Sequence, residues 1–416
     1  KRNKVPGIVV SLVSGSVKRG FPYLGNVPLI RYNNNWVDVI NLLLRTTLDQ
    51  YYQERLLTEI RRSIVPDNYF ILPFSPELLS FSLIDKTKKI LYPEPPLGSE
   101  EIDFLKIFDK DASFMTPIQA YSELSKSLKD KKIAISISES DDIQDYGGDE
   151  ALLRDITIEL SRHILVAGGK LIYGGDLRKQ GFTELFADLS CQYGQNEKKD
   201  RDTKYFTNYF AWPIHLNLTK THESDFEHSR VSIIKVDAPV ECPPKLTKNF
   251  IAPDSPENCF LWSKSLTKMR LQMEKSVSAR ILLGGRTHGF KGKYAGILEE
   301  FIISHTKEHP IYLLGGFGGA SKAIVDIIEN NSSETYLLEE ARKDPFYKDF
   351  MDYYNKKENI FPIDYAKVYK KIQESGFAGL RNGLTDEENK LLFQSTNVLE
   401  IVALILKGLN NKFQTI

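Results

Sequence analysis

The chain has 416 residues, and its 55 lysines and arginines are balanced by 55 aspartates and glutamates at a sequence pI of about 7.2. This length suits two or three domains with a large core. The balanced charge argues against nucleic acid or an anionic membrane as the main partner, whereas a small phosphorylated ligand needs only a local basic pocket.

The three cysteines, Cys191, Cys242 and Cys259, are odd in number and lack C-x-x-C spacing. They predict reduced thiols in a cytoplasmic protein, with no disulfide framework or zinc site. The apolar run at 401–406 is too short to span a bilayer, and no signal-peptide pattern is visible. Because the chain starts at Lys1 without a methionine, directly before an apolar stretch, we expect it to be part of a longer protein.

Residues 1–65 predict two short strands followed by one long helix. The run V-P-G-I-V-V-S-L-V is typical of a buried strand, a second strand is expected at 27–32, and a 3.6-residue apolar period predicts a helix at 36–62. These elements cannot close a domain alone, so they need partners from upstream residues or from another domain.

This segment resembles the carboxy-terminal half of a Toll/interleukin-1 receptor (TIR) domain. The resemblance rests on V-P-G-I-V-V-S-L-V, on F-P-Y-L-G-N-V-P-L-I-R-Y and on the helix that follows. It implies that NAD is the substrate of a complete TIR domain. In TIR enzymes the catalytic glutamate lies on a helix before this strand, and no residue of this chain corresponds to it, so the catalytic residue is unknown.

Residues 66–130 are expected to connect this segment to a larger domain. Proline-rich stretches predict extended segments broken by turns. Ser99 is the expected N-cap of one helix, and Thr116, followed by Pro117, is the expected N-cap of another. The apolar content of the connector indicates that it packs against other elements and is no flexible linker.

Residues 131–333 alternate apolar strands with amphipathic helices, and residues 334–416 predict a helical extension. Asp149 is expected to cap a helix, and Thr385 with Glu388 forms a capping box. The order of elements predicts an α/β fold with a Rossmann-like open parallel sheet. Strands are expected at 131–138, 171–174, 212–218, 231–236, 281–283 and 311–314, and helices at 149–166, from about 181, and at 258–277.

Three Gly-Gly pairs follow predicted strands, at 174–175, 284–285 and 315–316. Parallel strands end at one edge, and glycine lets the backbone come close to a ligand, so we expect one phosphate or ribose pocket there. The alternative is that each pair only makes a strand-to-helix turn. The candidate ligand-binding residues are Ser136, Ser138, Gly174, Gly175, Arg178, Thr183, Gly285, Arg286, Lys293, Glu299, Glu300, Gly316, Phe317, Gly318, Gly319 and Ser321.

The charged candidates have different expected roles. Arg178 and Arg286 follow Gly-Gly pairs, where arginine can bind phosphate in a bidentate way. Lys293 lies at a helix start and adds positive charge. Glu299 and Glu300 point about 100° apart on a helix. One is therefore expected to face the sheet edge and accept hydrogen bonds from ribose hydroxyls, and the other is expected to be solvated. The histidines lack metal-ligand spacing, so no metal site is expected.

Four motifs together resemble a SLOG domain, the SMF/DprA–LOG superfamily of Rossmann-like nucleotide-binding domains. They are S-I-S-E-S-D, L-I-Y-G-G-D-L-R-K-Q-G-F-T, L-L-G-G-R-T-H-G-F-K-G-K-Y-A-G-I-L-E-E and P-I-Y-L-L-G-G-F-G-G-A-S. The resemblance implies either binding of a nucleotide-derived signal or cleavage of a nucleotide's N-glycosidic bond. LOG enzymes carry P-G-G-x-G-T-x-x-E, whereas here Gly319 replaces the threonine and Lys322 the glutamate, which favours binding.

A TIR-like segment joined to a SLOG domain resembles bacterial anti-phage defence proteins related to Thoeris systems, whose SLOG domains bind cyclic ADP-ribose-like signals. The resemblance implies a sensor whose ligand controls oligomer assembly and NAD cleavage, without a tightly bound cofactor. Its partners would be a small nucleotide and further copies of the chain. Two alternatives stay open: a LOG-like enzyme that uses Glu299 or Glu300 in catalysis, and an oligomer-forming scaffold.

Overall fold

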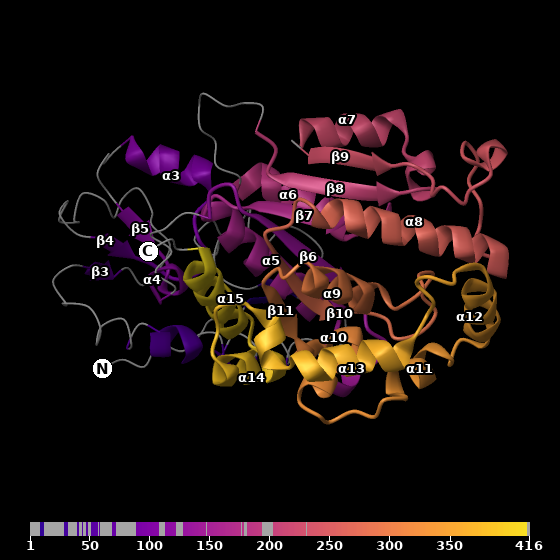
Figure 1. The fold of residues 1–416 in the computed structure, drawn as a ribbon. Coiled ribbons are helices and arrows are strands. Elements are labelled where there is room, and N and C mark those ends of the chain that lie inside the picture. Colours follow the sequence, from indigo (N-terminus) through magenta and orange to yellow (C-terminus); the bar gives the residue numbers. More distant parts are fainter. Residues whose placement is uncertain are drawn as a thin grey trace.

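The computed structural model describes residues 89–413 apart from 108–112, 122–127, 147, 176, 179–180, 194–202 and 230. Before residue 89 it describes only 9–11, 29–31, 40, 44, 47–48, 51–56, 58 and 69–71. A six-stranded sheet lies at the centre of the fold, with helices on both faces (Figure 1). Its strands are β6 (Lys132–Ser138), β7 (Lys170–Gly174), β8 (Phe206–Ala211), β9 (Val231–Val236), β10 (Ala279–Gly284) and β11 (Ile311–Leu314).

The strand order in this sheet is β11-β10-β6-β7-β8-β9, and every neighbouring pair is parallel. The predicted Rossmann-like open parallel sheet is therefore confirmed. From β6 the chain builds the sheet outward through β9, then returns to add β10 and β11 on the other side of β6. The order thus reverses between β6 and β10, which is the topological switch point of the sheet.

Both faces of the sheet are covered, as the continuous apolar runs of parallel strands require. Ile133 and Ile135 pack with helices α5, α6 and α15 (Val398–Phe413) on one face. Ala134, which alternates with them along β6, packs on the other face with Met269 and Met273 of α8 (Pro256–Glu274). Helices α8 and α9 lie side by side on that second face. The bounds are α5 (Glu150–Val166), α6 (Phe182–Tyr193), α7 (Lys220–His228), α8 (Pro256–Glu274) and α9 (Gly296–Thr306).

The predicted helical extension is also present. The run 401–406 belongs to α15 and is buried in the core that α15 shares with α5. Of the helices in the part of the chain that the structure describes, none combines the length and the apolar character needed to cross a bilayer. The helices are α10 (Gly319–Ile328), α11 (Tyr336–Ala341), α12 (Pro345–Lys357), α13 (Tyr365–Ser375), α14 (Asp386–Gln394) and α15 (Val398–Phe413).

Several helix caps confirm the sequence predictions. The Asp149 carboxylate accepts a hydrogen bond from the Leu152 amide at 2.8 Å at the start of α5. Thr385 and Glu388 form the reciprocal capping box of α14. Thr116 caps α4 (Pro117–Tyr121), where its hydroxyl accepts from the amide three residues later. Each cap satisfies an amide that would otherwise lack a partner in the first turn.

Two local predictions are wrong. The N-cap of α3 (Ser99–Lys106) is Gly98, not Ser99, because the Glu101 side chain reaches back to the Gly98 amide. The strand expected at 212–218 is instead β8 at Phe206–Ala211. Pro213 has no N–H to donate to a neighbouring strand, and a 3₁₀ turn follows it at Ile214–Asn217.

The amino-terminal elements are short. Strands β1 (Val9–Ser11) and β2 (Leu29–Arg31) pair in parallel, and β3 (Tyr69–Ile71), β4 (Lys89–Leu91) and β5 (Ser113–Met115) form a separate parallel sheet. The described residues of the helix predicted at 36–62 are helical, among them 51–56. Most of residues 1–65 lies outside the described part of the chain, so the TIR resemblance stays a prediction.

Candidate functional site

Four neighbouring strands, β11, β10, β6 and β7, end at the same edge of the sheet. Ser138 at the end of β6 pairs with Gly284 at the end of β10, and the Gly285 amide donates to the Ser138 carbonyl at 2.9 Å. Gly174 ends β7, on the other side of β6. The three Gly-Gly turns therefore follow β11, β10 and β7, with the end of β6 between the last two, around the point where ligands bind in sheets of this type.

Two arginines from different loops meet one carboxylate at this edge. Arg178 Nη1 lies 3.4 Å from Oε1 of Glu139, and Arg286 Nη2 lies 3.3 Å from its Oε2. Both arginine side chains are 50 % exposed and the glutamate is 40 % exposed. Ion pairs with this exposure contribute roughly 0–1 kcal/mol each, so an incoming anion can displace the carboxylate at small cost.

The loop that carries Glu139 supplies further carboxylates, and we call residues 139–142 the acidic loop. Asp141 lies 3.4 Å from Nε2 of His288. Asp142 accepts a hydrogen bond from the Gly319 amide at 2.8 Å. Gly319 is the first residue of α10, where the helix dipole favours negative charge. The acidic loop thus places one carboxylate between the two arginines and another at the start of α10, two positions that favour an anion.

The glycines of the last turn permit close contacts between loops. Gly319 has a φ of +64°, and a Cβ there would lie 2.2 Å from the Gly285 carbonyl oxygen, so only glycine fits. A Cβ at Gly316 would lie 2.5 Å from the carbonyl oxygen of Ser395. Gly316 therefore lets the segment before α15 pack closely against this turn. This agrees with the alternative that the Gly315–Gly316 pair only makes a strand-to-helix turn.

The polar candidates near the strand ends differ in their surroundings. Thr183 is buried, and its hydroxyl accepts from the Asn208 amide group at 3.2 Å. Phe317 is buried, and its carbonyl accepts from the Ser140 hydroxyl at 2.7 Å. Ser321, in the first turn of α10, is fully buried, and its hydroxyl has no hydrogen-bond partner within the described part of the chain.

Glu299 and Glu300 do not lie as predicted. The expectation that one of them is solvated is wrong, because both form ion pairs on the sheet face beneath α8 and α9. Arg270 of α8 pairs with both carboxylates, and Glu300 also lies 2.7 Å from Nη1 of Arg280 in β10. The Ser136 hydroxyl donates to Glu300 in the same cluster. A buried arginine is stable only when carboxylates neutralise its charge, and this explains why both glutamate side chains point into the core.

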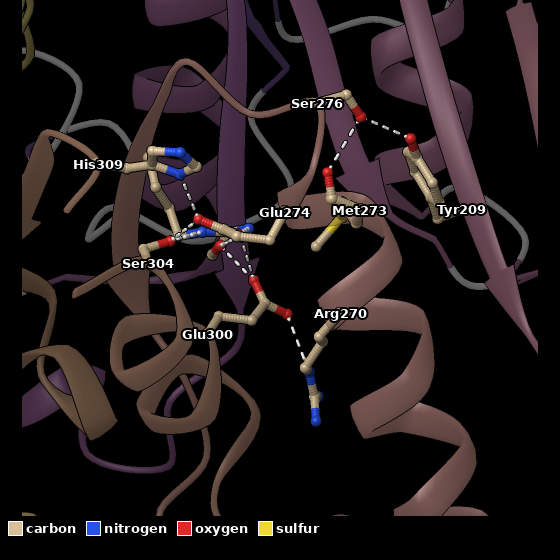
Figure 2. A network of polar contacts seen from close by, with 10 residues as sticks. Tyr209, Arg270, Met273, Glu274, Ser276, Glu300, Ser304 and His309 are labelled. Atoms are coloured by element: carbon tan, nitrogen blue, oxygen red, sulfur yellow. Dashed lines mark hydrogen bonds and ion pairs between the residues drawn. The ribbon is translucent and has the colours of Figure 1, made fainter. Parts of the chain in front are cut away.

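This cluster continues through Glu274, as Figure 2 shows. Glu274 pairs with Arg280, accepts from the Ser304 hydroxyl, and lies 2.7 Å from Nδ1 of His309. Burial alone would raise the pKa of Glu274, but the Arg280 charge and these hydrogen bonds outweigh it and lower the pKa. The cluster satisfies charges inside the core, so we assign it a structural role.

The structure also separates Lys293 from the two arginines. Lys293 lies with its ammonium 5.7 Å from the centre of the Tyr294 ring. Together with Glu299 it lines a cavity between α8 and α9, on the same sheet face as the buried cluster. No group of three or more His, Cys, Asp or Glu side chains that could hold a metal ion occurs among the described residues.

Sequence reasoning missed the acidic loop, although Glu139 belongs to the motif S-I-S-E-S-D. Its position directly after a strand was a usable signal. A protein-family model described as SLOG cluster2 matches residues 127–392, from just before β6 into α14. The curated proteins contain no match to the chain.

Proposed function

The chain belongs to the SLOG cluster2 family, and we propose that the carboxyl edge of its sheet binds a nucleotide-derived signal through the phosphates. Membership of this family supports nucleotide-related binding. The proposed ligand resembles cyclic ADP-ribose, which carries a pyrophosphate between two riboses. Its phosphates would replace the carboxylates of the acidic loop.

One observation carries the proposal: Arg178 and Arg286 converge on the two oxygens of Glu139. A phosphate group presents oxygens at a similar spacing, and the pyrophosphate of such a ligand carries two negative charges where the Glu139 carboxylate carries one. Arginine binds phosphate with directed, charge-assisted hydrogen bonds. The site therefore has its cations already arranged around an anion of the chain itself.

The start of α10 supports a second anion position. The Gly319 amide holds Asp142 there, and the buried Ser321 hydroxyl follows two residues later. Backbone amides at a helix N-terminus are a common phosphate site. A pyrophosphate that spans from the arginines to this helix would use both positions.

Binding is better supported than hydrolysis. Lys322 stands where LOG enzymes carry a glutamate, and it pairs with Asp326 one turn later. The other carboxylates considered for catalysis, Glu299 and Glu300, are held by Arg270 and so are not poised as an acid or a base. We therefore infer a sensor that controls assembly and NAD cleavage by a TIR domain, an effector role that rests on the sequence resemblance alone.

The first experiment is a thermal-shift screen of the chain with NAD, ADP-ribose, cyclic ADP-ribose isomers and cyclic dinucleotides, with adenosine as the phosphate-free control. The best ligand is then titrated calorimetrically into wild type and Arg286→Ala. Loss of one charged hydrogen bond costs roughly 1.5–3 kcal/mol, so affinity should fall about 10- to 150-fold.

The matched control is Arg381→Ala. Arg381 also forms a long ion pair with a glutamate, Glu308 at 3.5 Å, but it lies next to Asn382, which contacts the first residue of β11 at the opposite edge of the sheet. Unchanged affinity in Arg286→Ala would reject the site. Light scattering with and without the ligand tests the scaffold alternative, since a pure scaffold should not respond.

A further inference from the structure

We propose that the cavity between α8 and α9 is a second ligand site that takes a single-chain amphiphile with an anionic head. Its volume is about 640 Å³, within the range of roughly 300–1,000 Å³ typical of small-molecule sites. Tyr354 of α12 and Phe361 also line it, so the cavity has walls beyond the two helices. It does not include Arg178 or Arg286, so this proposal is independent of the nucleotide site.

The walls of the cavity are largely apolar. Leu271 of α8 and Ile302 and Ile303 of α9 line it, together with Val240 and Phe361. Val240 is 94 % exposed, Phe361 68 % and Leu271 45 %. Large apolar side chains that remain this exposed around one cavity mark a surface that is covered by an apolar partner. A hydrocarbon chain along these walls would cover it.

Two of the lysines that line the cavity directly follow the last residues of α8 and α9. Lys275 and Lys307 follow Leu271 and Ile303 by four residues, so each lies one helical turn beyond an apolar wall residue on the same helix face. Both are exposed, and no ion pair joins either to a carboxylate in the described residues. Two unpaired ammonium groups beyond an apolar wall fit an anionic head group.

Two further lysines line the cavity without a carboxylate partner in the described residues: Lys268 donates to the Ala238 carbonyl, and Lys293 lies over the Tyr294 ring. Lys264 lies 2.8 Å from Glu241 and 2.6 Å from Glu358. Glu299 at the floor accepts from Thr267 and pairs with Arg270. The described residues that line the cavity therefore offer no unpaired carboxylate to a cationic ligand, and their lysines favour an anionic head group.

The experiment titrates the folded chain calorimetrically with dodecanoate and dodecyl phosphate, both below their micelle concentrations. These two probes separate a fatty carboxylate from a lipid-like phosphate. Butyrate tests the apolar chain, and dodecyltrimethylammonium tests the charge. We expect saturable binding of one or both dodecyl anions, with both controls weaker by about tenfold or more.

Charge-reversed variants locate the site. Lys275→Glu/Lys307→Glu should weaken the better probe about tenfold, whereas Lys390→Glu/Lys412→Glu, which changes two exposed lysines of α14 and α15, should bind as wild type. Phe361→Ala tests the apolar rim at an exposed position, where misfolding is not expected. Absence of dodecyl-anion binding, or equal affinity in the two double variants, would overturn the proposal.

Discussion

The guanidinium of Arg286 donates to the Glu139 carboxylate across 3.3 Å, and this contact joins the loops that follow β10 and β6. These two strands are neighbours at the point where the strand order reverses. A basic group and an acidic group thus face each other at the position where sheets of this kind bind ligands. The acidic loop holds the arginines in place and, at the same time, competes with any anionic ligand.

Asp142→Asn should strengthen binding of a phosphorylated ligand. The asparagine oxygen can still accept from the Gly319 amide, but the negative charge at the start of α10 is removed. A charge at a helix terminus contributes roughly 0.3–1 kcal/mol, so affinity should rise about two- to fivefold in calorimetric titration. Weaker binding would mean that Asp142 itself contacts the ligand favourably.

Arg280→Ala should destabilise the fold strongly. Arg280 is 1 % exposed and pairs with Glu274 and Glu300, so its removal leaves buried carboxylates without a counter-charge. Breaking a buried pair costs about 3–5 kcal/mol of the free energy of unfolding, measured in urea. Arg381→Ala, at a partly exposed pair, should cost less than about 1 kcal/mol. Similar losses in both variants would contradict the structural role of the buried cluster.

Stability should fall in acid partly through Glu274. Burial raises its pKa, but the Arg280 charge and its hydrogen bonds lower it below the usual value of 4.5 overall. The unfolded chain therefore takes up this proton first. The stabilisation is fully present above about pH 4.5 and is lost as the pH falls through the folded-state pKa. When the free energy of unfolding is measured in urea from about pH 7 to about pH 3.5, Glu274→Gln should lose less of it in acid than wild type. The same dependence on pH in both proteins would contradict the role of Glu274.

The three thiols should react at different rates. Cys191 is exposed, whereas burial raises the pKa of Cys259 to about 11 and also raises that of Cys242. At about pH 8 only about one in a thousand Cys259 side chains is the reactive thiolate. A colorimetric disulfide reagent should label one thiol quickly, and Cys191→Ser should remove that fast phase. Fast labelling that persists in Cys191→Ser would show that a buried thiol is accessible.

The fold could be predicted from local patterns because parallel strands are continuous apolar runs and the caps use short-range hydrogen bonds. Asp149 and Thr385 show this for the helix starts. Strand β8 was missed because F-T-N-Y-F-A carries polar residues within it. One of them, Asn208, is fully buried and donates to Thr183, a contact that only the folded chain provides.

The site could be predicted only in part. The order of strands along the chain does not give their order in the sheet, so the position of Glu139 between Arg178 and Arg286 could not be derived. The adjacent Glu299 and Glu300 were predicted to bind ligand because the arginines that pair with them could not be identified from the sequence. Arg270 lies about thirty residues earlier in the chain, and Arg280 lies within an apolar strand. Arg280 within the run A-R-I-L-L-G was the signal that a buried ion pair exists.

The most direct test of the proposed site is the calorimetric affinity of Glu139→Gln for the ligand that the screen identifies. Removing this carboxylate frees both arginines, and two exposed ion pairs are worth together about 0.5–2 kcal/mol. The affinity should therefore rise by about two- to thirtyfold, and the gain should disappear when Glu139→Gln is introduced into Arg178→Ala/Arg286→Ala. Weaker binding by Glu139→Gln, or an undiminished gain in the absence of both arginines, would contradict the account.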